Sequence, residues 1–164
     1  LATGFDVTTL ASRINISGKD GITLAEDWAD ENPRALLGIT VPKFPNLFIM
    51  YGPNTNMGHG GSGMWLAETQ SSYITERICD MVDNDIATVE CISELRDEYT
   101  ERIDALPADL VWAHPGTPTY YRTAAGKVRS PMPFRLVDYW TMTNERGLED
   151  FITTPHSTSS TTGS

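Results

Sequence analysis

The segment from Leu47 to Gly63 constrains the fold of this chain more than any other. Leu47–Tyr51 is a run of apolar residues without a charge, which predicts a strand buried on both faces. Gly52 and Pro53 end the run, and a glycine-rich loop leads into a long amphipathic stretch, about residues 64–82. A strand, a glycine-rich turn and a helix N-terminus suit a large anionic ligand, because backbone N–H groups and the helix dipole face it. An ordinary strand–helix loop with turn glycines has the same pattern, and both interpretations stay open.

The chain also opens inside a predicted element. Residue 1 is Leu rather than Met, and Leu1–Asp6 starts within what looks like a strand and its following turn. A strand buried on both faces needs neighbouring strands, and nothing before it supplies them. We therefore expect a C-terminal piece of a longer protein, truncated at its N-terminus.

Composition excludes several classes of function. The net charge of −10 and the scattered Lys and Arg residues argue against nucleic acid, because nothing gathers to neutralise phosphates. Cys79 and Cys91 form neither a disulfide framework nor a zinc site, and His59, His114 and His156 have no ligand spacing. We expect no metal, a reducing, cytoplasmic compartment, and no membrane span, since no apolar stretch approaches about 20 residues.

Periodic apolar positions predict two helices. The first runs from Gly61 or Ser62 to Met81, with a stripe at helical spacing: Met64, Ala67, Ser71, Ile74 and Ile78. The second runs from Ser93, its expected N-cap, to Leu106, with the stripe Leu95, Tyr99, Ile103 and Leu106. Residues 17–21 lie between two short alternating segments and predict a hairpin. Residues 153–164 are rich in Ser and Thr and predict a disordered tail.

The sequence was compared with two short motifs of known chemistry, the dinucleotide fingerprint and the nucleophile elbow of hydrolases. Gly58–Gly63 literally satisfies G-x-G-x-x-G, but six residues separate it from Tyr51 and a helix continues where the next strand is expected, so we reject the dinucleotide fingerprint. No G-x-S-x-G elbow is present, which leaves a hydrolase weakly supported. A cluster of late aromatic residues suits either a satellite core or a wall against a flat ring: Trp112, Tyr120, Tyr121, Tyr139 and Trp140. Three nearby cations are candidate phosphate donors: Arg122, Lys127 and Arg129.

The order of these motifs resembles a known family. Leu1–Asp6 is similar to the A-T-G-[FY] segment of flavin-containing and Baeyer–Villiger monooxygenases. The succession that follows is similar to the 4-hydroxyacetophenone branch of the Baeyer–Villiger enzymes: residues 18–21, Trp28, 33–35, 37–42, 44–48, 52–56, 58–62, 111–116, 121–122, 126–128, Pro133 and 136–140. The resemblance covers about residues 1–151.

The resemblance implies an α/β fold, as the C-terminal part of a Rossmann-like, two-domain flavoprotein. It implies FAD and NADPH as cofactors, with O₂ and a ketone or aryl ketone as substrates. In this scheme residues 1–90 complete the FAD-binding domain, with the hairpin, buried strand, glycine-rich loop and helix. Residues 91–152 add a helix and aromatic loops on the cofactor and substrate side, and residues 153–164 form the tail.

The resemblance also implies site residues. The flavin edge is expected to be lined by Asn54, Thr55, Asn56, Gly61 and Ser62, with Met64 against the ring. Tyr120 stands where relatives often have a Trp near the nicotinamide nucleotide. No catalytic residue is expected here, because the family's catalytic arginine and both glycine fingerprints belong upstream of Leu1, and this chain alone should be inactive. The alternatives are an N- or S-oxygenating flavin monooxygenase, an inactive remnant that acts as a binding protein, and a disulfide-type reductase.

Overall fold

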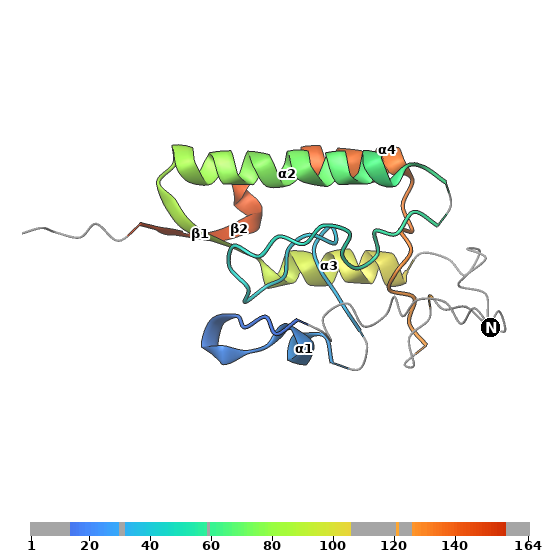
Figure 1. Ribbon diagram of the computed structural model, residues 1–164, viewed down its shortest axis with the longest axis horizontal. Coiled ribbons are helices and arrows are strands. Elements are labelled where there is room, and N and C mark those ends of the chain that lie inside the picture. The colour runs from blue at the N-terminus through green and yellow to red at the C-terminus, as the bar shows by residue number, and fades with distance from the viewer. Residues whose placement is uncertain (1–13, 30–31, 59, 106–120, 122–125, 157–164) are drawn as a thin grey trace, which may run out of the picture.

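The structure is a computed structural model of the 164-residue chain, and it describes residues 14–29, 32–58, 60–105, 121 and 126–156. In chain order its elements are η1 (Lys19–Gly21), α1 (Leu24–Asp27), α2 (Gly63–Asp83), β1 (Ile86–Cys91), α3 (Ser93–Asp104), α4 (Leu136–Asn144), η2 (Leu148–Asp150) and β2 (Phe151–Pro155). Figure 1 shows them in tiers, with α2 and α4 side by side, α3 below them, and α1 at the far side. None of the described helices is long and apolar enough to cross a bilayer.

Helix α2 is the longest element, and its predicted bounds are confirmed to within two residues. Ser62 is the N-cap, and its side chain accepts a hydrogen bond from the Met64 N–H at 3.2 Å. The predicted apolar stripe is wrong in phase, because Met64 is 81 % and Ile78 48 % exposed. The face that packs on the core instead carries Leu66, Thr69, Gln70, Tyr73 and Arg77.

Helix α3 follows the prediction more closely. Its predicted face is confirmed where the structure describes it, with Tyr99 buried and with Leu95 and Ile103 packed against the core. Ser93 is the first helical residue rather than the N-cap, and the cap position belongs to Ile92. No side chain caps this end, so the helix depends on its packed face more than on a cap.

Strands β1 and β2 form an antiparallel ribbon that the sequence did not predict. Cys91 pairs with Phe151 and Val89 with Thr153, and the apolar members of these pairs are buried in the main core. Residues 153–155 were expected in the disordered tail, and this is wrong because the backbone of β1 pairs with them. The predicted boundary between residues 90 and 91 lies inside β1.

The expected strand at Leu47–Tyr51 does not form. Phe48 makes a single antiparallel bridge with Thr40, and the Ile49 N–H donates to the Ile39 carbonyl at 2.8 Å. Asn46 and Tyr51 take left-handed backbone angles, with φ of 58° and 59°, and this ends the extended run on both sides. Burial on both faces is also wrong, since Tyr51 is 42 % exposed.

Two hydrophobic clusters lie on either side of residues 35–44. Leu36, Leu37 and Ile39 belong to the larger cluster, with residues of α2, α3, α4 and the ribbon. Ala35, Val41 and Phe44 belong to the smaller one, with Leu24 and Trp28. The predicted hairpin at residues 17–21 closes on this smaller cluster as one bridge, between Ser17 and Thr23. Thr23 then starts α1 with a capping box to Glu26.

Candidate functional site

The N-terminus of α2 is the open end of the molecule's longest helix. Residues 60–64 are exposed, and the first turn of α2 contains no acidic side chain. A helix of 21 residues carries a full dipole, so its first turn presents partial positive charge to solvent. This end therefore suits an anionic group that approaches the backbone.

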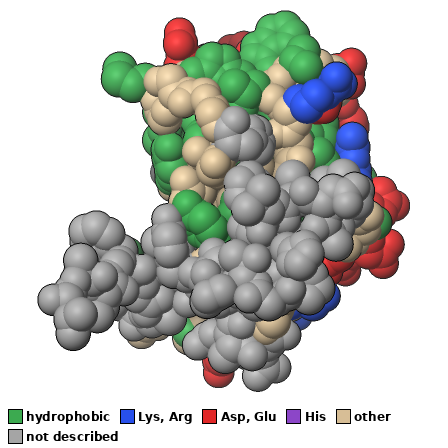
Figure 2. Space-filling view, turned by 90° about the vertical axis from the view of Figure 1, so that its right-hand side faces the viewer, with side chains coloured by type: hydrophobic (Ala, Val, Ile, Leu, Met, Phe, Trp, Pro, Cys, Tyr) green, Lys and Arg blue, Asp and Glu red, His purple; other side chains and the backbone are tan. Residues whose placement is uncertain are grey.

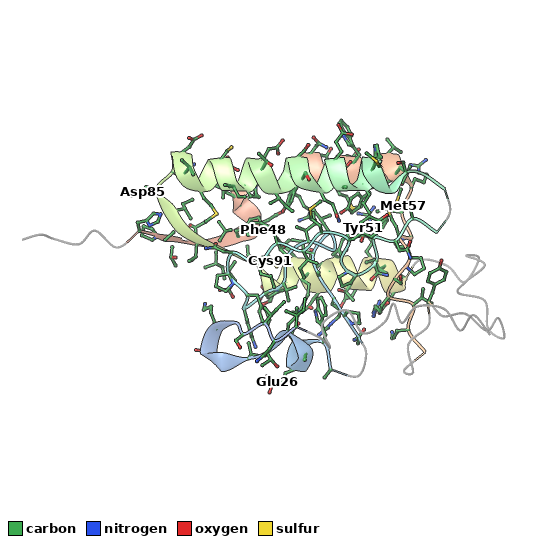
Figure 3. The ribbon with its side chains drawn as sticks, viewed as in Figure 1. Glu26, Phe48, Tyr51, Met57, Asp85 and Cys91 are labelled. Carbon is green, nitrogen blue, oxygen red and sulfur yellow. The ribbon has the colours of Figure 1, made fainter. Side chains whose placement is uncertain are left out.

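Two glycines form the turn that leads into α2. Gly60 and Gly61 have φ of +107° and +104°, angles that residues with a side chain rarely adopt. A Cβ at Gly61 would lie 2.5 Å from Met57 Cε and 2.9 Å from Leu136 Cδ1, whereas a Cβ at Gly60 would meet no atom of the described residues within 4 Å. The turn is thus packed from inside at Gly61 and open to a ligand at Gly60. Figure 3 places Met57 and Tyr51 beneath this end of α2.

Asn54, Thr55 and Asn56 lie just before this turn, as predicted, but their side chains face the protein. The Asn54 side-chain amide donates to the carbonyls of Val128 at 3.2 Å and Pro131 at 3.4 Å. The Thr55 hydroxyl donates to the Gly52 carbonyl at 2.7 Å. The Asn56 side chain lies 3.3 Å from the Ser130 hydroxyl. These side chains therefore hold the loop in place rather than face a ligand.

A chain of buried hydrogen bonds holds the segment at Tyr51, just before this loop, against the core. The Gln70 side chain accepts from the Tyr51 N–H at 2.9 Å and donates to the Tyr139 hydroxyl at 3.0 Å. Tyr139 in turn donates to the Leu37 carbonyl at 2.7 Å. Burial raises the pKa of Tyr139 far above its ordinary value, so the hydroxyl stays protonated and keeps this donor role. Tyr139 is thus a core residue rather than a wall against a ligand, but it belongs to the larger hydrophobic cluster and not to a satellite core, while its neighbour Trp140 is half-exposed.

The same end of the molecule carries exposed apolar side chains. Figure 2 shows hydrophobic side chains gathered at the top of this face, over α2 and α4. Met64 of α2 and Val137 and Trp140 of α4 are the most exposed large apolar residues of these helices near this end. A ligand at the α2 N-terminus would therefore meet apolar surface beside the polar turn.

Two of the cations that we considered as phosphate donors are already paired. Arg129 is 2 % exposed and binds Asp104 and Asn32, and Lys127 lies 3.1 Å from the Asp104 carboxylate. A phosphate would have to displace these partners, so we withdraw Arg129 as a donor. Arg122, Trp112 and Tyr120 lie outside the described residues, as do His59 and His114. Across the described part of the chain, no three His, Cys, Asp or Glu side chains gather to hold a metal ion.

Comparison with known proteins identifies relatives over nearly the whole chain. It is 34 % identical over 155 residues to an uncharacterized monooxygenase, y4iD, of Sinorhizobium fredii, and this match covers 94 % of the chain and 23 % of the relative. It is 33 % identical over 156 residues to the FAD-binding monooxygenase ktnD of Aspergillus niger, covering 93 % and 25 %. A Baeyer–Villiger monooxygenase of Pseudomonas aeruginosa is 30 % identical over 119 residues, covering 73 % and 22 %. No family model matches the chain.

Solved structures agree with these relatives. The complex of OTEMO with FAD and NADP superposes with a TM-score of 0.76 at 24 % identity, covering 93 % of this chain and 28 % of that one. Cyclohexanone-bound cyclohexanone monooxygenase superposes with a TM-score of 0.68 at 27 % identity, covering 92 % and 27 %. The chain belongs to the family of Baeyer–Villiger-type, FAD-binding monooxygenases. The expected fold class is thereby confirmed.

The chain spans about a quarter of the length of the Baeyer–Villiger-type relatives that it matches. The sequence predicted that a loop ends at the N-cap of α2, Ser62, but not the contacts that hold this loop. Gln70 was assigned no part in the site, Tyr139 was considered either as core or as a wall against a flat ring, and Arg129 was considered as a phosphate donor. One signal was available for Tyr139, because the L-V-D-Y-W segment was part of the resemblance. None was available for Gln70, whose role depends on a contact 69 residues away.

Proposed function

We propose that this chain forms part of an FAD- and NADPH-dependent monooxygenase that uses O₂ to insert one oxygen atom into a ketone, giving an ester or lactone. The observation that carries the proposal is the similarity of nearly the whole chain to FAD-binding and Baeyer–Villiger monooxygenases. The open helix end described above is the part of this chain that fits a flavin.

Bound FAD, reduced by NADPH, would supply the oxygen chemistry, and the protein would orient it and keep water away. The contribution of this chain is electrostatic. The N-terminus of α2 would face the pyrimidine edge of the flavin, where negative charge gathers on reduction, and the helix dipole would stabilise that charge. Ser62 keeps this end of the helix ordered, and Gly60 leaves room for a close approach of the ring.

Two further roles are part of the proposal. Met64 would pack on the flavin ring, which is supported by its 81 % exposure in the first turn of α2. Tyr120 would lie near the nicotinamide nucleotide, which is supported by the family resemblance alone. On that prediction, Tyr120→Ala raises the KM for NADPH and leaves the KM for the ketone unchanged.

The finer identity of the substrate and the compartment are proposals of the same kind. Aryl ketones are supported by the resemblance to the 4-hydroxyacetophenone branch. A cytoplasmic location is supported by the two cysteines, which are both free, with Cys79 exposed and Cys91 buried.

The test is a visible absorption spectrum of the protein expressed from the complete reading frame that contains this chain. We expect a flavin spectrum that NADPH bleaches under nitrogen, followed by oxygen uptake when a ketone is added. Cyclohexanone and acetophenone distinguish alicyclic from aryl ketones, and a methyl aryl sulfide detects S-oxygenation. A folded protein that stays colourless with added FAD would overturn the proposal in favour of a remnant. Turnover of the sulfide alone would favour the heteroatom-oxygenating alternative.

A further inference from the structure

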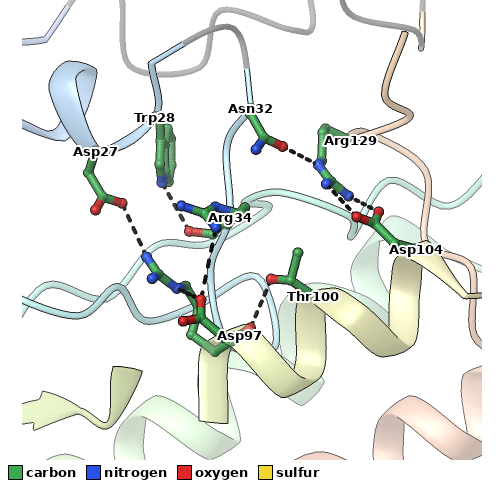
Figure 4. A network of polar contacts seen from close by, with 9 residues as sticks. Asp27, Trp28, Asn32, Arg34, Asp97, Thr100, Asp104 and Arg129 are labelled. Carbon is green, nitrogen blue, oxygen red and sulfur yellow. Dashed lines mark hydrogen bonds and ion pairs between the residues drawn. The ribbon is translucent and has the colours of Figure 1, made fainter. Parts of the chain in front are cut away.

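Arg129 is a buried cation that lies beside Asn32 and Asp104, at one side of the polar network in Figure 4. Its Nη1 lies 2.6 Å from Asp104 Oδ1 and its Nη2 lies 3.1 Å from Asp104 Oδ2. Its Nε donates to Asn32 Oδ1 at 2.7 Å. The fork of an arginine matches a carboxylate in this two-bond arrangement, and lysine cannot reproduce it. The side chain is therefore fixed to the last residue of α3.

The backbone of Arg129 is fixed to a different part of the molecule, the loop of residues 54–56. The Arg129 carbonyl accepts from the Asn54 N–H at 2.8 Å, and the Ser130 carbonyl accepts from the Asn56 N–H at 2.9 Å. The Met132 N–H returns a bond to the Asn56 carbonyl at 2.7 Å. Residues 128–132 therefore hold the 54–56 loop by a short parallel ladder, in which Asn56 bridges to Pro131.

The 54–56 loop sets the position of the turn before α2. Met57 follows it directly, and the Met57 methyl group fills the space under Gly61. Because close-packed side chains transmit displacement, a shift of Asn56 would carry Met57 and the Gly61 turn with it. A continuous chain of contacts thus runs from α3 through the Arg129 side chain to the N-terminus of α2.

We propose that Arg129 is a positioning residue of the cofactor site: its pair with Asp104 holds residues 128–132, which hold the 54–56 loop and the turn at the N-terminus of α2. The part of this inference that concerns a cofactor rests on the proposed function. Arg129 acts on the site from inside the protein, since its side chain is only 2 % exposed and its Nε, Nη1 and Nη2 already bind Asn32 and Asp104.

The experiment compares three variants of the full-length protein with the wild type. Arg129→Gln removes the charge, and Arg129→Lys keeps the charge but loses the two-bond geometry, which guards against a variant that fails to fold. Arg135→Gln is the matched control, because Arg135 makes the same pair with Asp138 at 2.7 Å but its side chain is 79 % exposed. The first readout is hydrogen–deuterium exchange of peptides that cover residues 54–57 and 128–132. The second is the dissociation constant for FAD.

We expect exchange in both peptides to become at least about tenfold faster in both Arg129 variants and to stay unchanged in Arg135→Gln. FAD binding should weaken by about tenfold in the Arg129 variants alone. Unchanged exchange in folded Arg129→Lys and Arg129→Gln overturns the inference, and so does faster exchange with unaltered FAD affinity. If the wild type binds no FAD, the proposed function fails, and the exchange measurement still decides whether Arg129 holds the 54–56 loop.

Discussion

Gly60 and Gly61 are neighbours with nearly the same backbone angles and different surroundings. Any side chain at either position incurs backbone strain of about 1–3 kcal/mol. At Gly61 a new Cβ also meets Met57 and Leu136, and at Gly60 it meets open space. Comparing substitutions at the two positions therefore separates the energetic cost of the unusual backbone angles from the cost of placing a side chain in occupied space.

We predict that Gly61→Ala lowers the free energy of unfolding by about 1 kcal/mol more than Gly60→Ala does. The reason is that the new methyl group at position 61 displaces the Met57 methyl group, and the flexible Met57 side chain can relieve this clash only in part. Urea titration of the two variants measures the difference. Equal losses would mean that Met57 and Leu136 move aside freely and do not pack the turn from inside.

At the residue scale, the sequence predicted those conformations that depend only on neighbouring residues. Gly61 and Ser62 were placed at the start of the helix because glycines and an N-cap are signals that neighbouring residues carry. Prediction from the sequence failed where a side chain has a distant partner. Arg129 was read as a free cation, and only the fold brings Asp104 and Asn32 to it, from 25 and 97 residues away.

At the scale of elements, α2 shows why periodicity misplaced its buried face. The prediction followed apolar residues, yet the buried face includes the polar Gln70 and Arg77. Gln70 is buried because the Tyr51 N–H and the Tyr139 hydroxyl satisfy its amide, and Arg77 because it donates to the Arg146 carbonyl. Hydropathy cannot reveal such partners. The same holds for β1 and β2, whose pairing joins residues sixty or more positions apart.

We predict that Tyr139→Phe lowers the free energy of unfolding by about 1–3 kcal/mol, because the buried Gln70 side-chain NH₂ group and the buried Leu37 carbonyl both lose the hydrogen bond to the Tyr139 hydroxyl. Tyr99→Phe is the matched control in the same hydrophobic cluster. The Tyr99 hydroxyl is buried and has no hydrogen-bond partner in the described part of the chain, so its loss should change stability by less than about 0.5 kcal/mol. Thermal unfolding of the two variants measures both effects. A Tyr99 variant that loses as much as the Tyr139 variant would contradict the assigned chain of hydrogen bonds.

At the scale of the whole molecule, ion pairs connect α3 to α1 and to the segment of residues 128–132. Arg96 of α3 lies 3.5 Å from Asp27 of α1, and Arg129 binds Asp104 as described. Burial by itself raises the pKa of Asp104, but the hydrogen bonds and charges of Arg129 and Lys127 outweigh it and hold the pKa below its usual range. A carboxylate with a lowered pKa stabilises the folded state above its unfolded pKa, about 3.9, and loses this contribution as the pH falls further.

We therefore predict that the melting temperature of the wild type falls more steeply between about pH 5 and pH 2 than that of Asp104→Asn, which has no carboxylate to protonate at this position. Asp138 is the matched comparison, because hydrogen bonds with Arg135 also lower the pKa of its carboxyl. The Arg135 side chain is 79 % exposed, however, so water screens this pair, and Asp138→Asn should keep more of the wild-type pH dependence than Asp104→Asn does. Parallel curves for the wild type and Asp104→Asn would show that the Asp104 pair contributes nothing to acid sensitivity.

The ladder between residues 54–56 and 128–132 also dictates an order of assembly. A ribosome releases Asn54 and Asn56 long before Pro131 and Met132. Likewise, Tyr139, whose hydroxyl binds the Leu37 carbonyl, is synthesised 102 residues after Leu37. Closing such long loops is slow, and local helices form first. The loop before α2 is therefore among the last parts of the molecule to reach its final shape, although it belongs to the first half of the chain. During synthesis, this region stays unformed until the segment that holds it has left the ribosome.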